Sequence, residues 1–344
     1  FIYDLSLDDL TDLLRAWGQP AYRAQQIWKG LYQNLWATPQ EFTNLPGALR
    51  QKLEESVRFS NLTPAQVMKS SDGETVKTLF RLPDDRAIES VLMEYDDQRR
   101  TLCISSQAGC AMGCVFCATG QMGFKRNLTS GEIVEQVMYY ARQLKQDGER
   151  VTNVVLMGMG EPFHNYDNTL TAIYRLNHPD GMNLGARRFT ISTVGLVPMI
   201  RRFAEEKHQI NLAVSLHAAV DEERSALLPV NRRYPIAELM DAVRDYITQT
   251  GRRVTFEFAL INEVNDTPEN ARALGKLLKG MLCHVNVIPL NPTQKFTGQA
   301  TTRARADAFC EVLGRYGIPC TVRMRRGIDI QAGCGQLATE FKPD

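Results

Sequence analysis

Three cysteines follow one another at close spacing, Cys110, Cys114 and Cys117, in a C-x3-C-x2-C pattern. Three thiolates this close repel one another unless they converge on a positive group. Structural zinc needs a fourth ligand and usually takes C-x2-C pairs, and the sequence has no such second pair. A three-cysteine set suits an iron–sulfur cluster whose fourth iron is left open to bind a substrate. We therefore expect a cluster here, with zinc or plain reactive thiols as the alternatives.

Five further cysteines are scattered along the chain. A lone cysteine is usually a small buried hydrophobe, and we expect that role for Cys283, Cys310 and Cys320. Cys103 is different because it stands at the end of a predicted strand, shortly before the triplet. Cys334 lies between two glycines in a stretch without apolar periodicity. That setting argues against core packing and makes Cys334 a candidate reactive thiol.

Polar residues and glycines gather where predicted strands end. In parallel α/β folds the ligand-binding residues lie at the carboxyl ends of the strands. Taken singly, each such residue is more often a cap or a turn residue, but together on one rim they favour a cofactor site. Glu161 can pair with an ammonium group. A dinucleotide-binding loop is disfavoured because Phe163 occupies the third glycine position of G-x-G-x-x-G. The candidates are Gly160, Glu161, Ser192, Ser215, Leu216, His217 and Asn291.

The elements that must hold these residues follow from apolar patterning. Six short apolar runs predict buried strands at 102–105, 153–157, 189–192, 212–216, 254–260 and 285–290. Helical patterns lie between them, at 129–144, 235–249, 268–279 and 301–316. This alternation predicts parallel βαβ units, in a doubly wound sheet or an open partial barrel. Residues 75–82 and 87–95 predict a β-hairpin, and 1–60 a small helical bundle that is either a partner-binding module or a cap.

Composition limits the function classes. Lys plus Arg is 40 and Asp plus Glu is 39, so the net charge of +1 excludes a uniformly basic nucleic-acid binder but not a local basic patch. Residues 300–328 form such a patch, with six arginines against two acids. No apolar run reaches the roughly 18 residues of a membrane span. With no charged-then-apolar leader at the N-terminus, the cysteines favour a reducing, cytoplasmic location.

The cysteine triplet after the first strand resembles the radical S-adenosylmethionine (SAM) superfamily. Five motifs in order sharpen this to the RlmN family of RNA adenine methyltransferases: 101–107, 116–120, 157–162, 215–217 and 332–337. The resemblance begins near Tyr22 and spans nearly the whole chain; one departure is Gly333, where many relatives have alanine. It implies an α/β fold, the radical SAM partial (β/α)6 barrel, over 101–320. It also implies an N-terminal helical domain over 1–60, a β-hairpin region over 61–100 and a C-terminal segment over 321–344.

The resemblance also implies a chemistry. Cys110, Cys114 and Cys117 would hold a 4Fe-4S cluster, and the strand-end residues would contact SAM. The target is carbon 2 of an adenine in 23S ribosomal RNA and in the anticodon loop of certain transfer RNAs. Cys334 would take a methyl group from one SAM and become S-methylcysteine, and a second SAM would yield a 5′-deoxyadenosyl radical that abstracts hydrogen from that methyl. Cys103 would then release the product by forming a disulfide with Cys334.

The proton acceptor that the family needs corresponds to Glu89, with Glu94 as the alternative because the spacing to Cys103 differs by one residue. The expected partners are RNA and an external electron donor such as flavodoxin, and the chain is expected to act as a monomer. A Cfr-type enzyme that methylates carbon 8 is the nearest alternative. A non-catalytic zinc or iron–sulfur protein that binds RNA is the alternative of another class.

Overall fold

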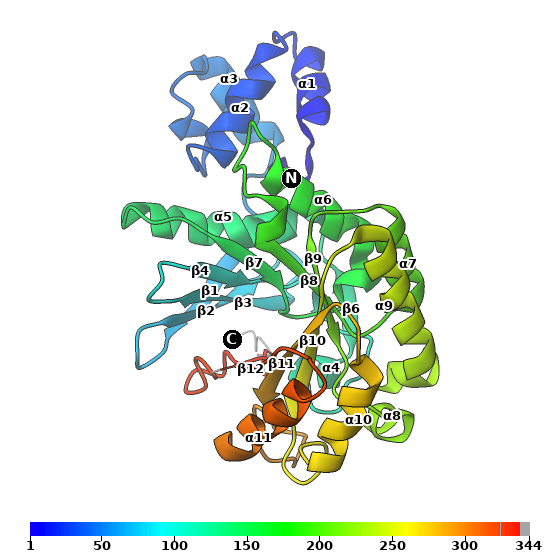
Figure 1. Ribbon diagram of the computed structural model, residues 1–344. Coiled ribbons are helices and arrows are strands. Elements are labelled where there is room, and N and C mark those ends of the chain that lie inside the picture. The colour runs from blue at the N-terminus through cyan, green and yellow to red at the C-terminus, as the bar shows by residue number, and fades with distance from the viewer. Residues whose placement is uncertain (324, 338–344) are drawn as a thin grey trace.

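The computed structural model describes residues 1–323 and 325–337. Its main feature is one ten-stranded sheet in the order β1-β2-β3-β4-β7-β8-β9-β10-β11-β12 (Figure 1). Two short strands, β5 (Gln107–Gly109) and β6 (Phe124–Asn127), form a separate hairpin. The strands of the large sheet are β1 (Thr63–Lys69), β2 (Thr75–Arg81), β3 (Ala87–Glu94), β4 (Arg100–Cys103), β7 (Asn153–Leu156), β8 (Phe189–Thr193), β9 (Asn211–Ser215), β10 (Val254–Leu260), β11 (Cys283–Pro289) and β12 (Cys320–Val322).

From β4 to β12 all neighbouring strands are parallel. The six predicted apolar runs are these strands, so the predicted radical SAM type of α/β barrel is confirmed, although β4 begins and ends two residues earlier than expected. The strand β12 extends the parallel set. The sequence did not predict it, because three residues are too few to show a periodicity. Helices pack outside the strands (Figure 1). They are α5 (Ser130–Gln146), α6 (Tyr166–Asn177), α7 (Val197–Glu205), α8 (Asp221–Leu227), α9 (Ile236–Thr250), α10 (Pro268–Leu278) and α11 (Arg303–Gly314).

The predicted hairpin is confirmed as β2 and β3, but it does not stand apart from the barrel. β3 pairs antiparallel with β4, and β1 adds a further antiparallel strand at the outer edge. β1 escaped prediction because nearly all its residues are exposed, which leaves no apolar run. The extension β1–β3 therefore continues the barrel sheet past its first parallel strand.

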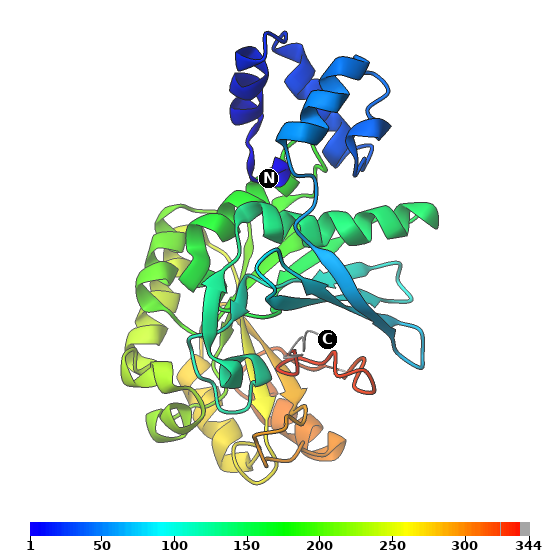
Figure 2. The ribbon, with the colours of Figure 1, turned by 180° about the vertical axis from the view of Figure 1, so that it is seen from behind.

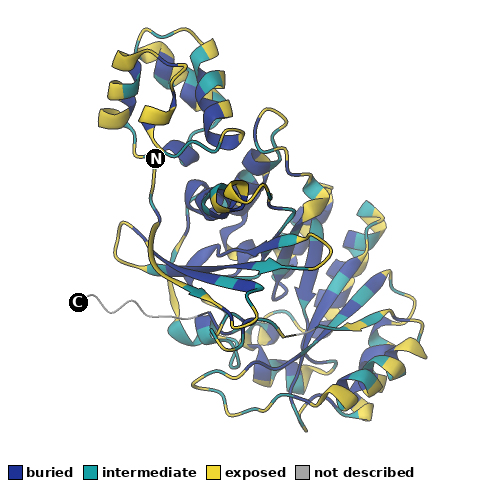
Figure 3. Cartoon of the chain, turned by 90° about the vertical axis from the view of Figure 1, so that its left-hand side faces the viewer, coloured by how far each residue is buried: buried dark blue, intermediate teal, exposed yellow. Residues whose placement is uncertain are grey.

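The N-terminal helices α1 (Leu7–Ala16), α2 (Tyr22–Tyr32) and α3 (Gly47–Ser56) form a bundle at one end of the molecule (Figures 1 and 3). A capping box between Ser6 and Asp9 starts α1. Ile27, Trp28 and Leu31 are buried in the same apolar core that continues into the barrel. The bundle is thus packed on the barrel rather than linked to it by an exposed tether.

The last described residues return to the barrel. The segment 325–337 lies between the extension β1–β3 and the strands β11 and β12 (Figures 1 and 2). Asp329 accepts a hydrogen bond from the Ser71 backbone at 2.8 Å on the extension side. Asn291, after β11, donates to the Cys334 carbonyl at 3.0 Å on the other side. The segment therefore spans the opening of the incomplete barrel.

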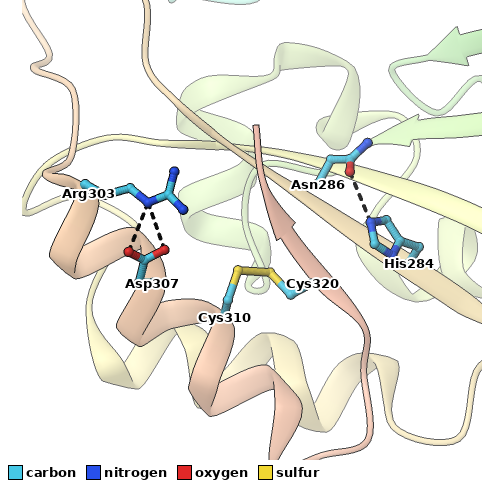
Figure 4. The surroundings of a disulfide bond; sticks show 6 residues. All are labelled: His284, Asn286, Arg303, Asp307, Cys310 and Cys320. Atoms are coloured by element: carbon cyan, nitrogen blue, oxygen red, sulfur yellow. Dashed lines mark hydrogen bonds and ion pairs between the residues drawn. A yellow bond between two sulfur atoms is a disulfide. The ribbon is translucent and has the colours of Figure 1, made fainter. Parts of the chain in front are cut away.

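Two of the three cysteines expected to be simple packing residues are not free. Cys310 in α11 and Cys320 in β12 form a disulfide (Figure 4), so that part of the prediction is wrong. A helix, a turn and a strand bring the two sulfurs together over ten residues, and spacing alone gives no sign of it. The expectation holds for Cys283, which is free and buried.

Candidate active site

The cysteine triplet lies in a loop that the small hairpin encloses. Cys110 follows β5, and Cys117 precedes the short helix α4 (Ala118–Met122), which leads into β6. Gly109 has φ +74°, and a Cβ there would lie 2.0 Å from the Gly123 carbonyl oxygen, so only glycine fits where the hairpin closes. The Cys110 amide donates to that same oxygen at 3.1 Å. The hairpin thus fixes one end of the cysteine loop.

The three cysteines line one cavity at the carboxyl ends of the parallel strands, here called the cluster cavity. Of the predicted cofactor residues, all but Leu216 line it: Gly160, Glu161, Ser192, Ser215, His217 and Asn291. Cys334 lines it as well. Strand ends β7 to β11, widely separated in the sequence, are therefore brought to the same space as the triplet.

The three buried thiols would ionise only beside a positive group. Burial raises the pKa of Cys110 to about 12 and raises that of Cys114 well above its ordinary value. Their mutual repulsion acts in the same direction. A bound metal reverses this by holding the sulfurs as thiolates. Within residues 1–323 and 325–337, no three His, Cys, Asp or Glu side chains are grouped closely enough to hold a single metal ion.

Glu161 joins two strand ends. Its carboxylate accepts hydrogen bonds from the backbone amides of Phe163 at 3.0 Å and Val194 at 2.8 Å. Burial raises its pKa to about 7. Gly160 precedes it with φ +104°, and a Cβ there would lie 2.6 Å from the Gln107 side chain. The tight backbone turn places Glu161 against the cavity wall.

His217 faces the cavity as a neutral ring. It has φ +59°, and its Nδ1 accepts a hydrogen bond from the Ala259 amide at 2.9 Å. Burial, helped by Arg224, lowers its pKa to about 3. With Nδ1 as the acceptor, the proton lies on Nε2. Leu216 is fully buried and does not line the cavity.

Arg224 is a site residue that the sequence analysis missed. It is fully buried, and it donates to the backbone carbonyls of Val194 at 2.7 Å and Leu216 at 3.1 Å. Burial lowers its pKa to about 10. It ties the ends of β8 and β9 together. An arginine in the acidic stretch of α8 gives no sequence sign of burial.

Two buried oxygen atoms on the cavity wall accept no hydrogen bond within the part of the chain that the structure describes. They are Asn291 Oδ1 and Glu257 Oε2, and the latter lies 3.8 Å from a guanidinium nitrogen of Arg323. A buried acceptor without a hydrogen bond costs free energy unless a ligand or water supplies one. Three cysteine sulfurs and two such acceptors around one space fit a cluster together with a ligand that carries hydroxyl or amino donors. Glu257 was not predicted.

Cys334 lies at the boundary between two cavities. The second, here called the basic cavity, is lined by Cys103 and Cys334 together with Tyr95 and the arginines Arg99, Arg323, Arg325 and Arg326. Burial raises the pKa of Cys103 to about 12, and the nearby Cys334 adds to the rise. Loss of water also raises the pKa of Cys334, while Arg323 opposes the change in both thiols. The two cysteines singled out in the sequence therefore share one cavity.

The sheet register separates the two candidate proton acceptors. Val91 pairs with Cys103 across β3 and β4, so residues an even number of positions from Val91 share the face that carries Cys103. Glu89 is on that face and is fully buried. Glu94 is on the opposite face, half-buried, and 3.6 Å from Arg100. Only Glu89 therefore lies on the face that carries Cys103.

Comparison with known proteins agrees with this geometry. The Radical SAM superfamily matches residues 104–274, and the ribosomal RNA large subunit methyltransferase N-terminal domain matches residues 2–58. A protein of Chloroflexus aurantiacus named probable dual-specificity RNA methyltransferase RlmN is 52% identical over 98% of this chain and 92% of its own. Dual-specificity RNA methyltransferase RlmN 1 of Myxococcus xanthus is also 52% identical, over 98% and 93%.

The chain belongs to the RlmN family. A solved structure, a radical SAM methyltransferase from Sphaerobacter thermophilus, superposes with a TM-score of 0.95 at 52% identity and covers 97% of this chain and 98% of its own. The fold and the enzyme class, a radical SAM RNA methyltransferase, are thus shown. None of the helices described is long and apolar enough to cross a membrane.

Proposed function

We propose that this RlmN family member methylates carbon 2 of adenine in 23S ribosomal RNA and in the anticodon loop of transfer RNAs, with two SAM molecules per turnover. One observation carries the proposal. Cys334 lines both the cluster cavity and the basic cavity, and Cys103 lines the second. A thiol at that boundary can receive a methyl group on one side and present it to RNA on the other.

In this proposal Cys110, Cys114 and Cys117 hold a 4Fe-4S cluster, and the remaining residues of the cluster cavity contact SAM. The cluster and SAM together supply a 5′-deoxyadenosyl radical. Glu257 Oε2 and Asn291 Oδ1, which accept no hydrogen bond from the described residues, accept hydrogen bonds from the bound ligand. Asn291 also holds the Cys334 carbonyl through its amide nitrogen.

The protein's own residues divide the methyl transfer into steps. Cys334 carries the methyl group as S-methylcysteine, because carbon 2 of adenine is not nucleophilic enough to take it directly. Glu89 accepts the ring proton, since it is the carboxylate on the Cys103 face. The Cys103 thiolate then attacks the sulfur of Cys334, and the bond from that sulfur to the transferred carbon breaks. That carbon takes up a proton to complete the methyl group of the product RNA, and the remaining unpaired electron would leave through the cluster. The Cys103–Cys334 disulfide that results must be reduced before the next turnover.

The basic cavity is the proposed route for RNA. The ring of Tyr95 lies between the guanidinium groups of Arg99, at 4.2 Å, and Arg326, at 4.3 Å. Arginine side chains hold phosphates and position the base without reading its sequence. A stacked adenine must leave its helix to reach Cys334 in this cavity. The enzyme would work on RNA in the cytoplasm, as a monomer, with electrons from an external donor such as flavodoxin.

The test is an anaerobic assay with SAM, a reductant and RNA, followed by mass spectrometry of the digested RNA. We expect 2-methyladenosine; 8-methyladenosine would indicate a Cfr-type enzyme instead. Cys334→Ala should abolish the product and keep the iron, and Cys103→Ala should trap a covalent protein–RNA adduct. Cys283→Ala is the matched control, because Cys283 is buried beside β10, and it should methylate normally. Methylation by Cys334→Ala, or tight zinc without iron, would contradict the proposal.

A further inference from the structure

Lys77, in the extension β1–β3, shares a sheet face with two of the residues proposed for the reaction. Lys77 pairs with Val91 across β2 and β3, and Val91 pairs with Cys103 across β3 and β4. Directly paired residues project to the same side of a sheet, as do alternate residues along a strand. Lys77, Glu89 and Cys103 therefore project to the same side.

Lys77 and Glu89 form a buried ion pair. The Lys77 Nζ atom is 3.0 Å from Glu89 Oε1, and the two side chains are 2% and 0% exposed. Desolvating one charge alone is very unfavourable, so a buried ammonium and a buried carboxylate persist as ions mainly because they face each other. A proton acceptor must be an anion before it can act. Lys77 thus supplies the charge that Glu89 needs in this interior position.

The same ammonium also reaches the segment that carries Cys334. Lys77 Nζ donates a hydrogen bond to the Gln331 carbonyl oxygen at 3.2 Å, three residues before Cys334. Gln331 has φ +52°, a conformation that a side-chain-bearing residue adopts only when its surroundings hold it. Nearby, a Cβ at Gly327 would lie 2.8 Å from the Thr75 side chain, so the turn packs directly on β2.

We propose that Lys77 is a positioning residue that links Glu89 to the turn that carries Cys334. It would hold the proton acceptor and the methyl carrier in a fixed relative position, so that both can reach the same adenine. The inference rests on the proposed function of Glu89 and Cys334. Lys77 itself forms and breaks no covalent bond. Its ammonium has two acceptors on different parts of the chain, one in β3 and one in the segment 325–337, and it sets their separation.

The first test uses Lys77→Met in the cluster-containing protein, with Lys77→Arg as the conservative variant. Cys334 is exposed already, and loss of the hydrogen bond to Gln331 frees the turn that orients it. The rate of Cys334 alkylation by iodoacetamide should therefore rise by at most roughly tenfold, the factor expected for one hydrogen bond to a charged group. Mass spectrometry of the tryptic peptide 327–344 reads this rate, because Cys334 is its only cysteine and the bond between Lys342 and Pro343 resists trypsin. Lys77→Arg should restore part of the protection. If Lys77→Met were alkylated at the same rate as the unmodified protein, the proposal that Lys77 holds the Cys334 turn would be wrong.

The second readout is the partition between adduct and product. A weakened proton acceptor slows release of the methylated RNA, so Lys77→Met should accumulate the covalent protein–RNA adduct and lower kcat more than it raises KM for RNA. Glu89→Gln should accumulate adduct without faster alkylation of Cys334. An unchanged partition in Lys77→Met, with the iron content retained, would overturn the coupling to Glu89.

A third variant guards against misfolding. Lys77→Met removes the cation that faces the buried Glu89 carboxylate, whereas Lys77→Met with Glu89→Gln removes both charges at once. In that double variant Cys334 should be alkylated faster than in Glu89→Gln alone. Equal rates would show that Lys77 does not hold the Cys334 turn. Alkylation needs neither RNA nor SAM. If the unmodified enzyme made no methyladenosine, the proposed function would fail while the alkylation arm would still decide whether Lys77 holds the turn.

Discussion

Glu135 offers a quantitative test of how the N-terminal bundle is joined to the barrel. This residue of α5 is buried, and its Oε2 accepts hydrogen bonds from the amides of Asn61 at 2.9 Å and Leu62 at 3.1 Å. Its Oε1 lies 2.5 Å from the Ser60 hydroxyl, which also lies 3.2 Å from the Leu62 carbonyl oxygen. A protonated Glu135 can donate to Ser60 while Ser60 donates to Leu62. The site therefore satisfies a neutral carboxyl completely.

Burial raises the pKa of Glu135 from 4.5 to about 7. Between these values the folded chain keeps a proton that the unfolded chain has lost, so the free energy of unfolding falls as the pH rises. Above the folded pKa, Glu135 no longer makes the free energy of unfolding depend on pH. The loss between about pH 5 and about pH 8 is roughly 2 to 3 kcal/mol for this shift. Glutamine reproduces the protonated form, with its amide donating to Ser60. Glu135→Gln should therefore remove this loss.

The assay is thermal unfolding of the unmodified protein and of Glu135→Gln at both pH values. For a chain of this length, the difference between the two proteins should change by about 3 to 4 °C in Tm from the lower to the higher pH, with the variant gaining. Groups that titrate elsewhere cancel because both proteins contain them. Two results would refute the assignment of a neutral Glu135. One is a variant that is less stable than the unmodified protein at the higher pH, and the other is a variant whose stability depends on pH in the same way as that of the unmodified protein.

Three further outcomes follow from the structure. Gly158→Ala should destabilise the protein by about 1–3 kcal/mol in thermal unfolding, because its Cβ would lie 2.7 Å from the Ile104 carbonyl, whereas Gly185→Ala meets nothing within 4 Å and should be neutral. Reductant should lower the Tm of the oxidised protein by about 4 °C by opening Cys310–Cys320, a short loop whose closure contributes about 3 kcal/mol, and should leave Cys310→Ser unchanged. Glu89→Gln should lower kcat for RNA methylation roughly 100-fold while Glu94→Gln retains activity, and equal effects would contradict the register argument.

The site is held by contacts that are local in the sequence and by contacts between distant parts of the chain. The cysteine loop is set locally by a hairpin of about twenty residues, from Gln107 to Asn127. The position of Cys334 depends instead on residues from the extension, such as Ser71 and Lys77, and on Asn291 from the far side of the barrel. Substitutions in the extension can therefore alter the reaction although they lie far from the triplet in sequence.

The sequence determined what short-range patterns can encode. Close spacing identified the cysteine triplet, apolar periodicity located the barrel strands, and the glycines around Cys334 separated it from the core cysteines. The motifs were sufficient to recognise the family, because each is contiguous. Their order along the chain then placed the polar residues at one edge of a parallel sheet.

Only the tertiary structure decided which distant side chains meet. The choice between Glu89 and Glu94 depends on strand register, which a shift of one residue reverses. Cys310 and Cys320 bond because a helix packs on a strand, and Arg224 is buried because three chain segments close around it. Lys77 and Gln331 are 254 residues apart and touch only because the last segment crosses the opening of the barrel. Local sequence patterns specify a helix or strand and its buried face, but the contacts between elements form only when these elements pack together in the tertiary structure.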